Sequence, residues 1–262
     1  MKQFLYSLAI GVMTMTAMPV QADQPAGNIG AQTDLAHSGE RGYSDPIEPV
    51  NRFFFGFNRL SNEYVLHPAV EGYRFVVPYQ GRKVISNFVR NLRSPENFAN
   101  HLLQGDLKGA GHVLFRFTVN TLTGFGGLLD VAEWEGYKHH EEDFGQTLAV
   151  WGVGDGPYLV MPIFGPASLR DGVGYATDAY ANPFARYADN TDDAALENQL
   201  SGLAFLTQRN ALKDFQKDVY QNSVDPYVRM RNIVFQRRQA QIQDNGRVTE
   251  ESAQPDIPSY DF

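Results

Sequence analysis

The sequence of 262 residues contains no cysteine. This absence excludes disulfide bonds, a thiol nucleophile and the thiolate ligands that many structural zinc sites use. It also excludes an N-terminal cysteine that could carry a lipid anchor. Any folded body of this chain is therefore held together by packing and by noncovalent polar contacts.

Three further signals are missing. Beyond the N-terminus there is no run of about 18 apolar residues, so the sequence predicts no ordinary membrane-spanning helix. No G-x-S-x-G segment marks a hydrolase nucleophile. The net charge is −8, and we therefore expect no nucleic acid partner. Membrane contact stays open, because charge can be segregated locally.

The two ends of the chain differ from its middle. Lys2, the apolar stretch from Phe4 to Ala17 and the small-residue ending Val20-Gln21-Ala22 are typical of an export signal, which we predict over residues 1–22. Residues 23–44 are polar and contain glycine, and we expect a flexible leader there. Residues 245–262 are acidic, and we expect a disordered tail.

Apolar residues in the middle of the chain recur at the helical period. Asp45-Pro46 predicts a helix start, and one apolar face follows over 50–66, made of Phe53, Phe57, Leu60 and Tyr64. A second stripe covers 82–93 and consists of Val84, Ile85, Phe88, Val89 and Leu92. We expect Ser94-Pro95 to end that helix and to begin another one.

The same period predicts further helices over 108–122, 168–180, 193–221 and 226–242. Residues 158–166 are apolar but contain Pro162 and Pro166, which a central strand tolerates poorly, so we expect an irregular segment there. Together these patterns predict an all-α fold with a single helical domain over residues 45–244.

Three segments invite a chemical interpretation. His139-His140-Glu141-Glu142-Asp143 suggests a metal site, but adjacent residues diverge on a helix, and a solvated loop is the favoured alternative. Residues 152–157 (GVGDGP) lack the spacing of a nucleotide loop and predict a turn. Three residues, His101, His112 and Ser168, could meet in space as a hydrolase site, although no local pattern supports this.

Two groups of residues have two interpretations each. The apolar side chains Phe53, Phe57 and Phe88 either face the core, which is the default for an amphipathic helix, or face a membrane. Gly124, Gly126 and Gly127 either connect two helices or let a helical hairpin bend beside an apolar passage formed with Phe125, Leu128 and Leu129.

A longer pattern resembles the MlaA (VacJ) family. It begins with residues 43–52 (YSDPIEPVNR) and continues with 103–106 (LQGD) and 120–132 (NTLTGFGGLLDVA). Residues 144–148 (FGQTL), 152–158 (GVGDGPY), 225–227 (DPY) and 236–238 (QRR) follow in the same order. The resemblance therefore spans about residues 43–238.

The resemblance implies a ring-like helical protein with a central amphipathic channel, on the periplasmic side of the outer membrane. It implies removal of mislocalised phospholipid from the outer leaflet and transfer to an MlaC-like periplasmic carrier, with a trimeric porin as a partner. It implies neither catalytic residues, nor a metal, nor a cofactor. Gly124, Phe125, Gly126, Gly127, Leu128 and Leu129 are then candidates for lipid passage or gating.

In one respect this chain departs from the family pattern. Family members usually carry a lipidated N-terminal cysteine, and this sequence has none. Membrane residence would then depend on an amphipathic exterior, on a porin or on an uncleaved signal, since stable anchoring ordinarily needs more than one weak contribution. An envelope lipid hydrolase and a scaffold that does not transport lipid are the alternative functions.

Overall fold

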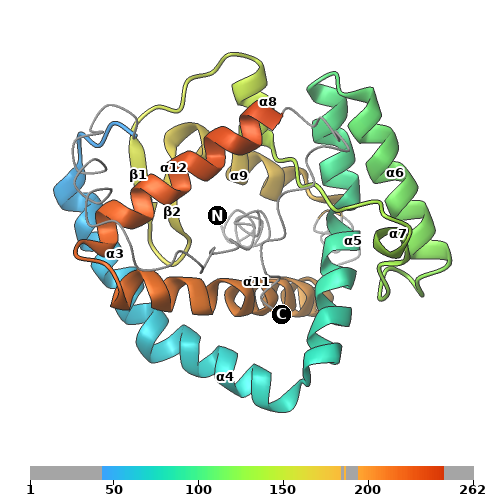
Figure 1. Ribbon diagram of the computed structural model, residues 1–262, viewed down its shortest axis with the longest axis horizontal. Coiled ribbons are helices and arrows are strands. Elements are labelled where there is room, and N and C mark those ends of the chain that lie inside the picture. Colours follow the sequence, from blue (N-terminus) through green and yellow to red (C-terminus); the bar gives the residue numbers. More distant parts are fainter. Residues whose placement is uncertain (1–42, 184–185, 187–193, 245–262) are drawn as a thin grey trace, which may run out of the picture.

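Helices follow one another around a ring in the computed structural model, which describes residues 43–183, 186 and 194–244 (Figure 1). The helices are α3 (Glu48–Ser61), α4 (His67–Val76), α5 (Tyr79–Leu103), α6 (Leu107–Leu122), α7 (Val131–Trp134), α8 (Phe144–Val150), α9 (Leu169–Ala181), α11 (Ala194–Gln221) and α12 (Pro226–Asp244). A π-helical turn, η2 (Asn62–Leu66), joins α3 to α4. The predicted all-α fold is confirmed.

The outer arc of the ring is formed by α3, α4 and α5 (Figure 1). Helices α11 and α12 cross the ring, and α6 packs along α5 as a helical hairpin on the outside. Helices α8 and α9 pack on each other, and α9 also packs on the hairpin formed by β1 (Tyr158–Met161) and β2 (Gly165–Ser168). The architecture therefore places α3, the hairpin, α9, α11 and α12 around a common space.

The predicted break at Ser94-Pro95 is wrong, because α5 runs through it. Polar side chains hold the helix on both sides of Pro95. Before it, Asn91 donates to the Thr121 hydroxyl at 3.0 Å. After it, Asn97 accepts a hydrogen bond from the Glu142 amide at 2.9 Å. Contacts at both ends offset the one backbone hydrogen bond that proline cannot make.

The helix predicted to start at Asp45-Pro46 begins at Glu48 instead, and no side chain among the described residues caps it. The Asp45 carboxylate instead accepts hydrogen bonds from Asn51 at 2.7 Å and from the Tyr227 hydroxyl, and it pairs with Arg231 at 3.2 Å. The start of the folded body is thereby tied to α12 near the other end of the chain.

Residues 158–168 form an antiparallel hairpin where an irregular segment was expected. Tyr158 pairs with Ser168, and Val160 pairs with Pro166. Proline is tolerated in β2 because the sheet has two strands, so each strand has an edge that needs no strand partner. The prediction failed because a four-residue strand gives almost no alternation to detect.

Two asparagines of α3 complete the free edge of β1. Asn51 donates to the Tyr158 carbonyl at 2.9 Å and accepts from the Val160 amide at 2.9 Å. Two turns later on the same helix face, Asn58 donates to the Met161 carbonyl at 2.9 Å and accepts from the Ile163 amide at 2.6 Å. A side-chain amide carries the same donor and acceptor as a peptide group, so α3 serves as a substitute third strand.

Aromatic side chains fill the space between α3, the hairpin and α12. Tyr43 stacks on Tyr158 with ring centroids 5.7 Å apart and meets Phe235 edge-on at 5.0 Å. Phe55 meets Tyr227 edge-on at 5.5 Å. Tyr43 was expected in the flexible leader, but it is buried in this core. The predicted signal peptide, residues 23–42 of the predicted leader and the tail beyond residue 244 lie outside the described residues.

We expect Asn51→Ala to lower the free energy of unfolding by about 3 kcal/mol, because it leaves a buried amide and a buried carbonyl of β1 unpaired. Denaturant titration of the purified protein measures this change. The exposed Asn198 of α11 offers a matched control, and Asn198→Ala should stay within about 0.5 kcal/mol of wild type. Equal effects of the two substitutions would contradict the role given to Asn51.

Candidate functional site

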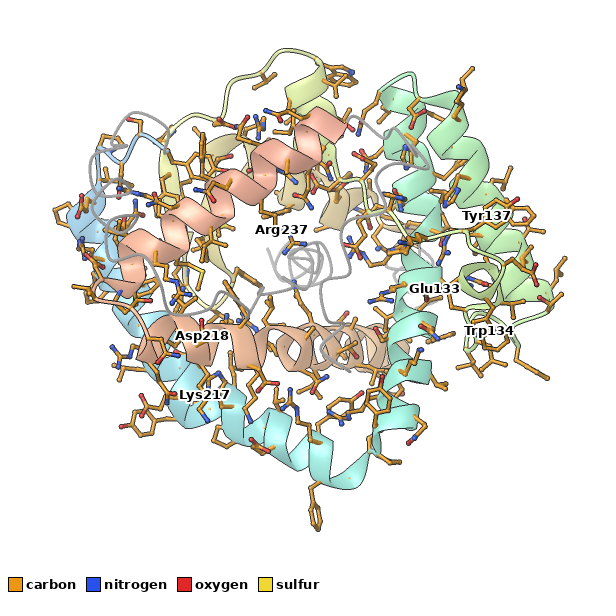
Figure 2. The ribbon with its side chains drawn as sticks, viewed as in Figure 1. Glu133, Trp134, Tyr137, Lys217, Asp218 and Arg237 are labelled. Atoms are coloured by element: carbon orange, nitrogen blue, oxygen red, sulfur yellow. The ribbon has the colours of Figure 1, made fainter. Side chains whose placement is uncertain are left out.

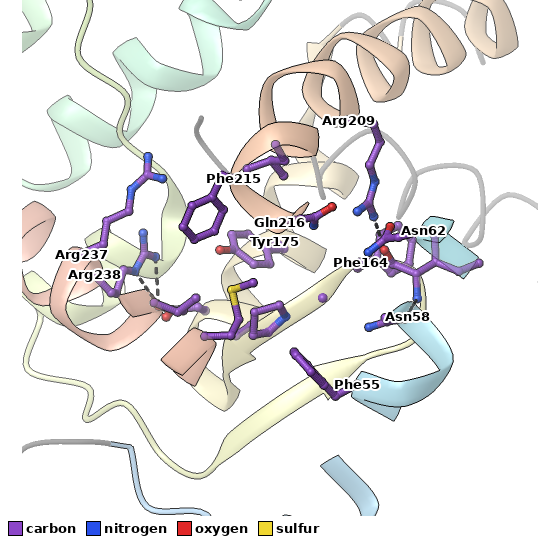
Figure 3. A pocket seen from close by; sticks show the side chains of 18 of the residues that line it. Phe55, Asn58, Asn62, Phe164, Tyr175, Arg209, Phe215, Gln216, Arg237 and Arg238 are labelled. Atoms are coloured by element: carbon purple, nitrogen blue, oxygen red, sulfur yellow. Dashed lines mark hydrogen bonds and ion pairs between the residues drawn. The ribbon is translucent and has the colours of Figure 1, made fainter. Parts of the chain in front are cut away.

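A pocket lies between α3, the β1–β2 turn, β2, α9, α11 and α12 (Figure 3). It holds about 820 Å³ of empty space, a figure that includes space open to solvent. Much of its wall is apolar, with side chains of Phe55, Phe164, Leu212, Phe215, Met230 and Val234. The polar part of the wall consists mainly of Asn58, Asn62, Gln216, Gln241 and three arginines, Arg209, Arg237 and Arg238.

The arginines lie at two ends of the pocket. Figure 3 shows Arg237 and Arg238 on one side and Arg209 on the other, with Tyr175 and Phe215 between them. Arg237 points from α12 toward the middle of the ring, whereas Trp134 and Tyr137 lie at its outer edge (Figure 2). The pocket is therefore amphipathic, with cationic groups at separate places on an apolar wall.

Arg238 is the centre of a buried ionic network. Its two Nη atoms donate to the two carboxylate oxygens of Asp143, at 2.6 and 2.7 Å, and its Nε donates to Asp171 at 3.0 Å. The bidentate geometry is the strong form of an arginine–carboxylate pair. One side chain of α12 thereby joins the start of α8 to the start of α9.

Both aspartates sit where a helix begins. Asp143 caps α8 by accepting from the Gln146 amide at 2.9 Å, and Ser168 caps α9 by accepting from the Asp171 amide at 3.1 Å. Arg170 adds a second cation, 3.0 Å from Asp171 and 2.7 Å from Asp155. The network therefore continues to Asp155 in residues 152–157, where the structure has an irregular loop with a turn at Gly152 and a bend at Pro157.

Two glycines let α8 and α9 approach closely. A Cβ on Gly174 would lie 2.4 Å from the Gly145 backbone nitrogen. A Cβ on Gly145 would lie 2.4 Å from an Arg238 nitrogen. Side chains at these positions would push the helices apart and displace the arginine from its two carboxylates.

Burial and nearby charges shift the pKa values of several carboxyl groups in this part of the ring. Burial alone would raise the pKa of Asp143, but Arg238 and the Gln146 hydrogen bonds bring it below its ordinary value. Burial raises the pKa of Glu142 to about 7 in spite of a hydrogen bond from Gln104. Burial raises the pKa of Asp178 to about 8, and the nearby Glu96 and Asp143 add to this shift.

The 139–143 segment is not the solvated loop that was favoured. Glu142 and Asp143 are buried, and Asn97 binds the segment from α5. The cause is the charge network, which draws Asp143 to Arg238. Within residues 43–183, 186 and 194–244, no three histidine or carboxylate side chains converge as metal ligands would.

Each of the three residues considered for a hydrolase site binds a different group. His101 contacts Asp106 at 2.9 Å, His112 contacts the Lys138 carbonyl at 2.7 Å, and the Ser168 hydroxyl caps α9. None of the three is among the residues that line the pocket. The structure therefore does not bring them together there.

The glycine-rich segment forms the turn between α6 and α7, packed against α5. Gly126 and Gly127 have φ angles of +74° and +90°, and a Cβ on Gly127 would lie 2.4 Å from Asn91. Phe125 and Leu128 are exposed. None of the residues 124–129 lines the described pocket, so their role in lipid passage stays a prediction.

Apolar side chains are exposed around the outside of the ring. Of the three predicted membrane-facing residues, Phe53 and Phe57 are exposed and Phe88 is half-buried. Phe75, at 91% exposure, and Leu107, Leu122 and Trp134 extend the exposed set to other helices. In the part of the chain that the structure describes, no helix combines the length and hydropathy that a membrane span requires.

Comparison with known proteins gives one consistent result. A sequence model of the MlaA lipoprotein family matches residues 43–241. A Shigella flexneri protein named intermembrane phospholipid transport system lipoprotein MlaA is 35% identical over 205 residues, which cover 76% of this chain and 78% of the relative. The Escherichia coli protein of the same name is 34% identical with the same coverage.

A solved structure is also similar. Its description is "structural basis for maintenance of bacterial outer membrane lipid asymmetry". The TM-score is 0.66 at 34% sequence identity, and the match covers 76% of this chain and 99% of the solved chain. The similarity thus extends over nearly the whole of that structure.

We expect Arg238→Met to lower the free energy of unfolding by about 3–5 kcal/mol, because it leaves Asp143 and Asp171 buried without their shared cation. Arg229 on the same helix pairs with Asp218 at 3.1 Å but is partly exposed. Arg229→Met should therefore cost about 1 kcal/mol or less. Denaturant titration compares the two variants, and similar losses would contradict the central place of Arg238.

The raised pKa of Asp178 predicts a pH dependence of stability. Between its unfolded value near 4 and its folded value of about 8, the folded protein holds a proton that the unfolded chain has lost. The free energy of unfolding should therefore fall as pH rises, by at most about 1.4 kcal/mol per pH unit for this group. Asp178→Asn has no such proton, so its decline from pH 5 to 8 should be shallower. A variant that parallels wild type at every pH would refute this.

Proposed function

The chain belongs to the MlaA lipoprotein family, and we propose that it acts in intermembrane phospholipid transport at the bacterial outer membrane. It removes mislocalised phospholipids from the outer leaflet and thereby maintains the lipid asymmetry of that membrane. The observation that carries this proposal is the amphipathic pocket between α3, the hairpin, α9, α11 and α12. A phospholipid has the matching chemistry, since apolar chains suit the rings of the wall and a charged headgroup suits its arginines.

The outer surface supports residence at a membrane. Soluble monomers rarely expose large contiguous apolar patches, and such patches mark membrane or protein contacts. Phe53, Phe57 and Phe75 on the outer arc would contact lipid acyl chains or the surface of a trimeric porin. We place the protein on the periplasmic side of the outer membrane, where an MlaC-like carrier would accept the lipid.

The glycine-rich turn has a separate place in this proposal. Phe125 and Leu128 are exposed beside backbone that only glycine adopts easily, which supports contact with lipid at the outer edge of the ring. We propose that residues 124–129 guide or gate lipid there. The turn is anchored to α5 by two asparagines: Asn87 donates to the Leu128 carbonyl at 3.3 Å, and Asn91 donates to the Gly126 carbonyl at 3.4 Å.

Transport fits the described residues better than lipid hydrolysis does. A hydrolase needs a nucleophile beside a base and an open position for the ester. Ser168 is fully buried and caps α9, and the two histidines contact other groups. We therefore infer that the protein binds lipid without catalysis.

We expect Gln216→Trp to impair lipid removal, because the indole would occupy the pocket from the α11 side. The measurement is the amount of phospholipid exposed on the surface of cells whose only family member is the variant, at equal protein abundance. Surface phospholipid should rise above the wild-type level.

The control is the same substitution five residues later. Gln221 is exposed on α11 and does not line the pocket, so Gln221→Trp should leave surface phospholipid unchanged. Normal surface phospholipid in the Gln216→Trp strain would argue for a scaffold that does not transport lipid. Accumulation of lysophospholipid or free fatty acid in wild-type cells would support a hydrolase instead.

A further inference from the structure

Arg209 of α11 is a buried cation without a carboxylate partner among the described residues. Its side chain reaches the end of the pocket near Asn62 and Phe164 (Figure 3). Only 6% of its surface is exposed. Its Nη2 donates to the Ile163 carbonyl, and its guanidinium lies 5.0 Å from the Phe205 ring centroid. Its Nε has no hydrogen-bond partner in the part of the chain that the structure describes.

The other fully buried arginines are all paired. Arg116 lies 2.7 Å from Asp130, Arg170 lies 3.0 Å from Asp171, and Arg238 contacts both Asp143 and Asp171. Burying an arginine without a counter-charge is costly. Among the described residues, Arg209 therefore has no carboxylate where its counterparts have one. An anionic ligand would supply the missing negative charge.

Burial lowers the pKa of Arg209 to about 10, so the side chain still carries its charge at neutral pH. A neutral donor such as glutamine could satisfy the Ile163 carbonyl alone. The positive charge of Arg209 is therefore not needed to hold the β1–β2 turn, since Asn58 already makes two hydrogen bonds there, with Met161 and Ile163.

The surroundings of Arg209 restrict the kind of anion. Phe164, Leu212 and Phe215 belong to the same pocket wall, so a small hydrated anion would leave this apolar surface uncovered. An anion attached to acyl chains would cover it. The planar guanidinium suits a phosphate group, to which it can donate two hydrogen bonds.

We propose that Arg209 binds the phosphodiester group of a glycerophospholipid held in the pocket, with the acyl chains against the apolar wall. This assignment rests on the proposed transport function. It makes Arg209 a lipid-binding residue that distinguishes phospholipids from uncharged lipids of the same chain length.

Calorimetric titration of the purified full-length protein in detergent tests this assignment with three probes. They are dihexanoyl phosphatidylglycerol, phosphate-free dihexanoylglycerol and inorganic phosphate. We expect Arg209→Gln to weaken binding of the phosphatidylglycerol about tenfold or more, the size of a lost charge-assisted pair. Binding of the dihexanoylglycerol should be unchanged, and Arg209→Lys should show an intermediate loss.

Two control variants separate charge from structure. Asn58→Ala removes the other side chain that binds the β1–β2 turn without changing the charge, and Lys217→Gln removes an exposed cation from the same helix. Because Asn58 also lines the pocket, Asn58→Ala should lower the affinity for both lipids by the same factor, whereas Lys217→Gln should leave both affinities unchanged. Both variants should therefore keep the preference of the wild type for phosphatidylglycerol over dihexanoylglycerol. Retention of that preference by Arg209→Gln would overturn the assignment.

Two other results would also overturn it. Equal loss of both lipids in Arg209→Gln and Asn58→Ala would show that Arg209 only holds the turn. Binding of inorganic phosphate as tight as that of phosphatidylglycerol would show a free-phosphate site. Wild-type protein that binds neither lipid would instead contradict the proposed function itself, so the two failures are distinguishable.

Discussion

The ring depends on the ionic contacts of Arg238 with Asp143 and Asp171. The three residues come from α12, the start of α8 and the start of α9, and they are separated by 95 and 67 positions in the sequence. Since the chain has no cysteine, no disulfide can link these segments. Removal of Arg238 leaves the buried Asp143 without its cation, so the network favours a single arrangement of the three helices around the pocket.

Buried polar contacts also join distant segments around α3 and β1. Asn51 and Asn58 make α3 the neighbour of β1, and Asp45 ties the start of the chain's folded part to α12. Buried polar groups of this kind must all be satisfied, which fixes the relative positions of the elements more narrowly than apolar contact does. These polar contacts lie behind the pocket wall and fix the elements that form it, so the wall itself can be apolar and partly open. Arg209 differs from these groups, because it has no carboxylate partner within residues 43–183, 186 and 194–244.

The sequence predicted what depends on local periodicity and could not predict what depends on distant partners. The stripe of Val84, Phe88 and Leu92 was enough to place a helix, but nothing local showed that Asn91 and Asn97 would carry it across Pro95. The hairpin was missed because its strands are too short to show alternation, and because the asparagines that bind its free edge, Asn51 and Asn58, belong to the distant helix α3. The family resemblance covered Asp143's neighbours and Arg238, yet only the fold brings them into contact. Arg209 had no local signal, since its significance is the absence of a nearby carboxylate.

Whether the pocket holds a phospholipid is the central claim, and native mass spectrometry of the intact protein, released gently from detergent, tests it most directly. The account predicts a population with the added mass of one phospholipid, identified by its fragments as an envelope lipid. Free protein alone, under conditions that keep lipid on a known lipid-binding control, would contradict the account.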